Sequence, residues 1–134
     1  MNAALALQKA MRSALLVHAP LTTLLGGAHV FDELPRGAKA PHVEFAGIET
    51  RDWSVVGEKA HEHFVQLAVT TNERGRALAQ AIAQEIETAL DGATLTLINH
   101  NLINLRLVFA SVSRTRVDMA FSATLRFRAA TEPN

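Results

Sequence analysis

The feature that most constrains the fold is an alternation of apolar and polar or small residues from Thr115 to Arg128. Because successive side chains of a β-strand point to opposite faces of a sheet, this pattern predicts one long strand with an apolar and a polar face. Burying its six apolar side chains contributes on the order of 10 kcal/mol. The other elements are therefore expected to cover or flank this strand. The apolar positions are Val117, Met119, Phe121, Ala123, Leu125 and Phe127.

The composition is that of an ordinary globular protein, with 134 residues, of which 49% are apolar and 19% charged. This length can bury a core without covalent staples, and we expect residues 1–134 to form one α+β domain. Acidic and basic residues are equal in number, at 13 each, so the net charge is zero. The chain as a whole therefore has no electrostatic attraction to nucleic acid or to an anionic membrane surface. The absence of cysteine excludes disulfide scaffolds, thiolate metal sites and cysteine nucleophiles, and it fits a reducing cytoplasm. Neither a signal-peptide pattern nor an apolar run of membrane length is visible.

The rest of the chain alternates between helical and extended patterns. Main helices are predicted over 2–18 and 77–90, with a short helical restart over 21–25. Extended segments are predicted over 29–32, 42–50, 61–71, 94–98 and 102–112, with frayed residues at 131–134. In the segment 102–112, Ile103, Leu105, Leu107 and Phe109 are predicted to point inward. The order predicts an antiparallel, mixed sheet with two main helices packed on one face and a long β-hairpin arm over 51–60.

Six histidines raise the question of a metal site. His61 and His63 share one face of a predicted strand, and His42 is placed across the hairpin, so one alternative is a small metal- or ligand-binding α+β module. The sequence fixes no third ligand, and the pair continues the face of Val65 and Leu67, which favours a structural role. No glycine-flanked nucleophilic serine and no phosphate-binding glycine loop is present. We therefore expect no enzyme, no bound metal and no cofactor.

Basic residues lie on the polar faces of the last two predicted strands, and they are Arg106, Arg116, Arg126 and Arg128. Such a stripe can contact phosphates, which gives a nucleic-acid-binding domain as a further alternative. Asp118 interrupts the stripe, and the chain carries no aromatic ladder on which bases would stack. A solvated face, or a face paired with acids of a neighbouring subunit, is therefore favoured.

Apolar residues also occupy the face of the hairpin that should be wet. Ala46, Ile48, Phe64 and Ala68 are predicted on this outward face, with Trp53 at the tip of the arm. An apolar patch on a sheet marks a docking surface, and tryptophan is enriched at binding hot spots. The alternative is that Trp53 folds back and covers the sheet. The predicted interface residues are Ile48, Arg51, Asp52, Trp53, Val55, Glu58, Lys59 and Phe64.

Several short segments occur in an order that resembles a known family. They are His29-Val30-Phe31-Asp32 with Leu34-Pro35, then Pro41-His42-Val43, a loop with Trp53 and Gly57, Glu62-His63, and Leu125-Arg126-Phe127-Arg128. From about Leu5 to Glu132 the chain resembles the tail-completion or tail-terminator proteins of long-tailed bacteriophages and phage-like gene transfer agents. It departs from them at His42, where a tyrosine commonly follows the proline.

The resemblance implies a non-enzymatic homo-oligomer, a ring of six copies that caps the tail tube and joins it to the head-side connector or stopper protein. DNA would pass through the lumen without sequence-specific binding, and the four arginines would lie in the lumen or at an interface. The resemblance also implies a place in the tail or neck of a virion or phage-like particle, assembled in the bacterial cytoplasm. The sequence does not distinguish a phage from a gene transfer agent.

Overall fold

The computed structural model describes residues 2–72, 76–114 and 120–134. Within these ranges, three helices and a six-stranded sheet form the α+β fold that the sequence predicts. The helices are α1 (Ala3–Val17), α2 (Ala19–Leu25) and α3 (Arg76–Leu90). The strands are β1 (Val30–Phe31), β2 (His42–Asp52), β3 (His61–Thr70), β4 (Thr96–Leu97), β5 (His100–Arg114) and β6 (Phe121–Pro133).

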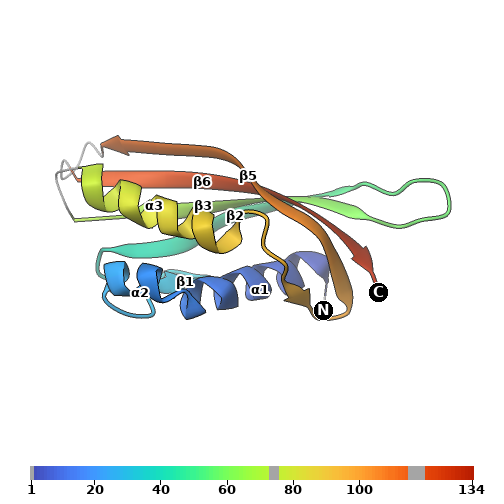
Figure 1. Cartoon of the computed structure of the whole chain (residues 1–134), viewed down its shortest axis with the longest axis horizontal. Helices are drawn as coiled ribbons and strands as arrows, with labels where there is room; N and C mark the ends of the chain where they lie inside the picture. Colours follow the sequence, from blue (N-terminus) through green and yellow to red (C-terminus); the bar gives the residue numbers. More distant parts are fainter. Residues whose placement is uncertain (1, 73–75, 115–119) are drawn as a thin grey trace.

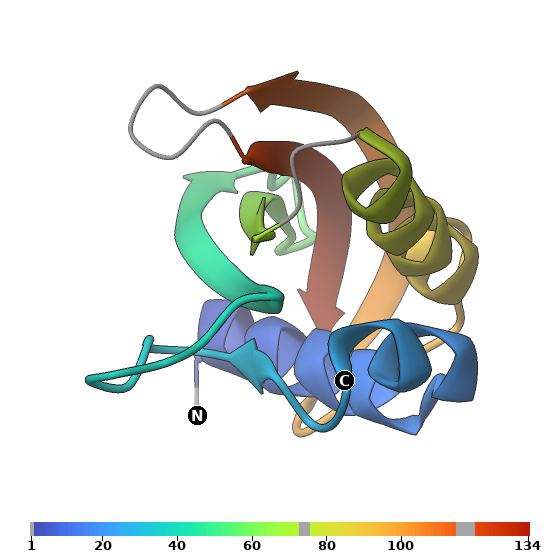
Figure 2. The same ribbon diagram turned by 90° about the vertical axis from the view of Figure 1, so that its left-hand side faces the viewer.

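The sheet has the strand order β1-β2-β3-β6-β5-β4. Only the β1–β2 pair is parallel among the described strands, so the sheet is mixed, as predicted. Its four long strands curl strongly, and the helices pack on one side of them (Figures 1 and 2). We call the opposite side, which no described helix covers, the open face.

The core lies between the helices and the long strands, with β6 at its centre. In β6, Phe121, Ala123, Leu125 and Phe127 are at most 4% exposed, which confirms the inward face predicted for the described part of the alternation. The helices contribute side chains spaced three or four residues apart, because these positions share one side of a helix. The fully buried ones include Leu7, Met11 and Leu15 from α1, and Ile82, Ile86 and Leu90 from α3.

The helix ends follow the local sequence. The Asn2 side-chain oxygen accepts a hydrogen bond from the Leu5 N–H at 2.8 Å and caps α1. Pro20 lies in the first turn of α2, where its missing N–H is not needed. Gly26 ends α2 with φ +79° and Gly92 follows α3 with φ +73°, a left-handed conformation that glycine adopts without strain.

Only the C-terminal end of the strand predicted over 115–128 can be compared with the structure, and it requires correction. Its first residues, 115–119, which include Arg116, Val117, Asp118 and Met119, lie outside the described residues. At its other end the predicted fraying is wrong, because β6 continues to Pro133. Thr131 is fully buried and pairs with His61 of β3 and with Leu102 of β5. Two flanking strands therefore hold the end of the chain.

Three β-bulges account for the errors in the predicted inward faces. They lie between Phe45 and Gly47 in β2, and between Leu102 and Asn104 and between Leu107 and Phe109 in β5. One extra residue reverses the side to which all following side chains point. As a result Phe109 is 52% exposed, although the simple alternation places it inside.

Two further predictions fail for the same reason. Ile103 is 46% exposed instead of pointing inward. Ile48, predicted on the outward face of the hairpin, pairs with buried Val65 and packs against the core. The outward apolar patch is therefore smaller than the sequence suggests.

Candidate functional site

A hairpin extends beyond the sheet at the end where β5 begins and β6 ends (Figure 1). The Trp53 N–H donates to the Ala60 carbonyl at 2.9 Å, and Val55 and Glu58 exchange two backbone hydrogen bonds at 3.0 and 2.9 Å. Residues 56 and 57 form the turn, and Gly57 has φ +82° there. We call residues 53–60 the arm.

The tip of the arm is apolar, but Trp53 is not part of it. Trp53 lies at the base of the arm, and its ring faces the Arg128 guanidinium at 5.1 Å on the open face. Its prediction as the tip is therefore wrong, although 45% of it stays exposed. The tip instead presents Val55, 67% exposed, and Val56, which is fully exposed. Most of the apolar surface of these two valines therefore stays in water within one copy of the chain.

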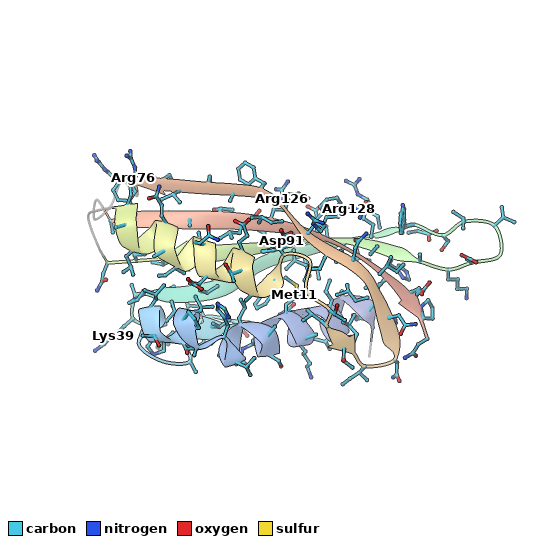
Figure 3. All side chains as sticks on the ribbon, in the orientation of Figure 1. Met11, Lys39, Arg76, Asp91, Arg126 and Arg128 are labelled. Atoms are coloured by element: carbon cyan, nitrogen blue, oxygen red, sulfur yellow. The ribbon has the colours of Figure 1, made fainter. Side chains whose placement is uncertain are left out.

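The open face carries charges that are partly paired. Arg128 donates to Glu62 at 2.7 Å and to the Asn104 side chain at 3.3 Å. Arg106 is bound to Asp91 at 3.2 Å, whereas Arg126 donates to the Gln66 side chain at 3.5 Å. Figure 3 shows Arg126 and Arg128 on the side of the molecule away from α1. Arg106 and Arg128 of the predicted basic stripe are therefore paired with carboxylates, which weakens phosphate binding, whereas Arg116 lies outside the described residues.

The other predicted interface residues lie around the base of the arm and along it. Arg51 faces the ring of Phe64 at 5.7 Å on the open face. The Asp52 carboxylate accepts a hydrogen bond from the Ser54 N–H at 3.0 Å, which stabilises the start of the arm. Glu58 and Lys59 are exposed on the arm. Ile48 is the exception, since it packs against the core.

The histidines do not assemble a metal site. His61 and His63 share a face as predicted, with ring centroids 6.2 Å apart, but His42 pairs with Thr70 at the other end of the hairpin. Both ring nitrogens of buried His63 are bound to threonine hydroxyls, Thr50 and Thr131, at 2.9 Å each. Across residues 2–72, 76–114 and 120–134, no group of three His, Cys, Asp or Glu side chains is arranged to hold a metal ion.

The long strands at both sides of the sheet leave much of their backbone unpaired. β1 covers the outer edge of β2 at two residues, and β4 covers the outer edge of β5 at two residues. Gly92 also donates its N–H to the Leu105 carbonyl at 2.8 Å, and Leu107 donates its N–H to the Asp91 carboxylate at 2.9 Å, so residues 91–92 cover a further part of the β5 edge. In the part of the chain that the structure describes, the long free stretches are therefore residues 45–52 and 108–114, which have a strand neighbour on one side only. The β5 edge also exposes Val108 and Phe109, at 51% and 52%. Long exposed edges with apolar residues promote pairing with another chain.

A profile of the family described as "Tail completion protein gp17" matches residues 9–132. The chain belongs to the tail completion protein gp17 family. This confirms the resemblance drawn from the sequence, and it assigns the chain to a family of structural proteins of phage-type tails.

Two solved structures are similar to this tail completion protein. One is a chain of the "Virion of native gene transfer agent (GTA) particle", with 30% identity and a TM-score of 0.88 over 98% of this chain and 99% of that one. The other is the gp17 protein of bacteriophage SPP1, with 22% identity and a TM-score of 0.63 over 98% and 91% of the two chains. No curated protein sequence matches this chain. None of the described helices is long and apolar enough to cross a membrane.

The contact between Trp53 and Arg128 gives a simple test of the arm base in this tail completion protein. We expect Arg128→Ala to uncover one face of the indole and to increase quenching of its fluorescence by acrylamide. Trp53 is the only tryptophan of the chain, so the signal is unambiguous. The free energy of unfolding should fall by about 1 kcal/mol, because Glu62 loses a partly buried partner.

Arg126→Ala is the matched control for this test. It removes a guanidinium from the same strand and the same face. Within the described part of the chain, this guanidinium lies over no aromatic ring. Equal quenching in the two variants would contradict the Trp53–Arg128 contact.

Proposed function

We propose that this tail completion protein forms a ring of six copies that caps the tail tube and joins it to the head-side connector, with DNA passing through the lumen. Family membership supports a place in the tail of a phage or gene transfer agent particle, together with other tail and neck proteins. The ring, its copy number and its neighbours are the parts that we propose.

The observation that carries the ring is the relation between the two free edges. β2, β3, β6 and β5 alternate in direction, so the outer strands β2 and β5 run opposite ways. A second copy, placed beside the first in the same orientation, therefore presents its β2 antiparallel to the β5 of the first. Each copy adds its sheet to the next, and such a head-to-tail contact closes into a ring when its rotation allows.

The short edge strands leave room for this pairing. β1 covers β2 near its beginning, at Val43 and Glu44, and β4 covers β5 near its beginning, at His100 and Asn101. Because the strands are antiparallel, these two covers lie at opposite ends of the interface. Between them, residues 46–52 of one copy can pair with residues 108–114 of the next, beyond the part of the β5 edge that Asp91 and Gly92 hold. Seven extended residues at about 3.3 Å each span roughly 23 Å, a long enough contact to hold a register.

The open face suits the lumen of such a ring. Four long strands from each of six copies, at a spacing of ~4.8 Å, give a circumference of roughly 115 Å, and strand tilt widens it. This leaves an opening through which a DNA duplex can pass, with the helices outside. Arg106 and Arg128 are paired with carboxylates, so the surface that would line the lumen neither repels DNA strongly nor binds it tightly. Such a nearly neutral surface favours the passage of DNA over its specific binding.

Replacing an edge residue with lysine tests the ring. We expect Val108→Lys to weaken assembly at least about tenfold, because a charged lysine on an edge strand opposes pairing with another strand. Val108 is 51% exposed, so the stability of the single copy should change by less than about 0.5 kcal/mol. Native mass spectrometry of the chain produced with its tail tube protein measures the number of copies per assembly.

Gln80→Lys, on the exposed side of α3, is the charge-matched control for Val108→Lys. It should assemble as the unaltered chain does. Rings of unchanged size and affinity from Val108→Lys would contradict pairing through the β5 edge.

A further inference from the structure

An open groove runs between α1 and residues 94–98. Its volume is about 590 Å³, and it is lined by Ala10, Ser13, Val17, Leu95 and Ile98, among others. Val17 is 82% exposed and Ile98 57% exposed, although both are strongly apolar. A single copy of the chain leaves this apolar surface in water, which indicates a docking site.

We propose, resting on the ring described above, that this groove binds the arm of the neighbouring copy. If β2 of that copy pairs with residues 108–114, the free part of the β5 edge, its last residue, Asp52, comes beside Val108. The arm then continues along residues 91–97, which cover the rest of this edge through Asp91, Gly92 and β4. Residues 94–98 also line the groove, so the groove lies beside the path of the arm.

The surfaces of the arm and of the groove are complementary. The arm tip presents Val55 and Val56, and the groove presents Val17 and Ile98. Contact between the tip and the groove would bury the exposed apolar surface of both pairs, which is favourable. Lys9 lies at the groove, and Glu58 lies beside the valines of the tip, held there by its backbone pairing with Val55. Each copy therefore carries an arm and a groove, two different surfaces that fit each other. A head-to-tail ring requires such a pair of different surfaces on every copy.

Disulfide trapping tests this contact, since the chain has no cysteine of its own. We would introduce Val56→Cys and Ile98→Cys together and purify the assembled particles under mild oxidation. Both positions are exposed in the single copy, so the substitutions should not disturb folding. The expected result is a ladder of covalently linked copies on a non-reducing gel, up to the full ring. A disulfide forms only when the two Cα atoms come within about 7 Å.

Leu34→Cys combined with Val56→Cys is the matched control, because Leu34 is exposed on the loop after β1, outside the groove. This pair should give no ladder. If the particles contain rings but the 56–98 pair forms no cross-link, the arm-in-groove contact is overturned and the ring proposal still holds. If the tails contain this chain but it forms no ring, the proposed function is overturned.

A photoreactive amino acid at position 56 identifies any other occupant of the contact. We expect its cross-linked peptide to come from α1 or from residues 94–98 of the same chain. A peptide from the tail tube or from the connector would also overturn the contact between copies, because it would place the arm against a different protein.

Discussion

A chain in which Asn-Gly replaces residues 54–59 is expected to fold normally and to lose ring formation. The replacement connects Trp53 directly to Ala60 through a two-residue turn. These two residues are already joined by a backbone hydrogen bond of 2.9 Å, and Asn-Gly favours the tight turns that close such a pair. The contact between Trp53 and Arg128 is retained, so fluorescence quenching reports whether the base of the hairpin is intact.

The shortened chain should keep its stability to within about 1 kcal/mol, because all of the deleted residues are exposed. Assembly should fail, since each copy loses the apolar tip that we assign to its neighbour. Unfolding in urea measures the first effect, and native mass spectrometry with the tail tube protein measures the second. Full-size rings from the shortened chain would show that assembly does not need the arm.

A double substitution separates the side chains of the tip from the length of the arm. Val55→Ser with Val56→Ser keeps the turn at Gly57 but removes most of the apolar surface of the tip. We expect it to weaken assembly, and to do so less than the shortened arm does. If it assembles as well as the unaltered chain while the shortened arm fails, backbone contacts of the arm, rather than its valines, hold the neighbour.

Much of this fold could be predicted from the sequence, because burial repeats along each element with a regular period. The alternation in β6 predicted a side that the structure buries, and the helix predicted over 2–18 is α1, Ala3–Val17. The family could also be predicted, because the order of short segments extends along nearly the whole chain.

The surfaces that we assign to contacts between copies were harder to predict, because they depend on interruptions of that period. The bulge in β2 turns Ile48 inward, and two bulges in β5 leave Ile103 and Phe109 outside. No single residue type marks a bulge, so simple alternation cannot reveal which apolar residues remain exposed. The groove was missed for a different reason. Val17 and Ile98 lie far apart in the sequence, and only the packing of α1 beside β4 brings them together.

The base of the arm should also make the protein sensitive to acid, through His63. Burial, together with the charges of His61 and His100, lowers the pKa of His63 to about 4. In the unfolded chain the pKa returns to about 6.5, so between these values the unfolded chain binds a proton that the folded chain excludes. Stability is therefore complete above about pH 6.5 and decreases as the pH falls toward 4.

We expect the unaltered chain to lose about 2 kcal/mol of stability between about pH 7 and about pH 5 from this group, and His63→Gln to lose much less. Burial also lowers the pKa of His42, which leaves a smaller loss of the same sign in the variant. Urea unfolding at the two pH values measures the difference. Thr131→Val is the control, since it leaves Nε2 of His63 unpaired and should lower stability at both pH values while the pH dependence persists.

The position of His63 connects this acid sensitivity to assembly. Its two nitrogens join Thr50 of β2 to Thr131 of β6 across β3, at the point where the hairpin leaves the sheet. A protonated imidazole must donate from both nitrogens, and it must do so in a site with no exposed surface and with two other histidines nearby. Acid should therefore loosen the arm before the core, and rings should dissociate at a higher pH than the one that unfolds a single copy. Dissociation and unfolding at the same pH would show that His63 stabilises the fold without controlling the arm.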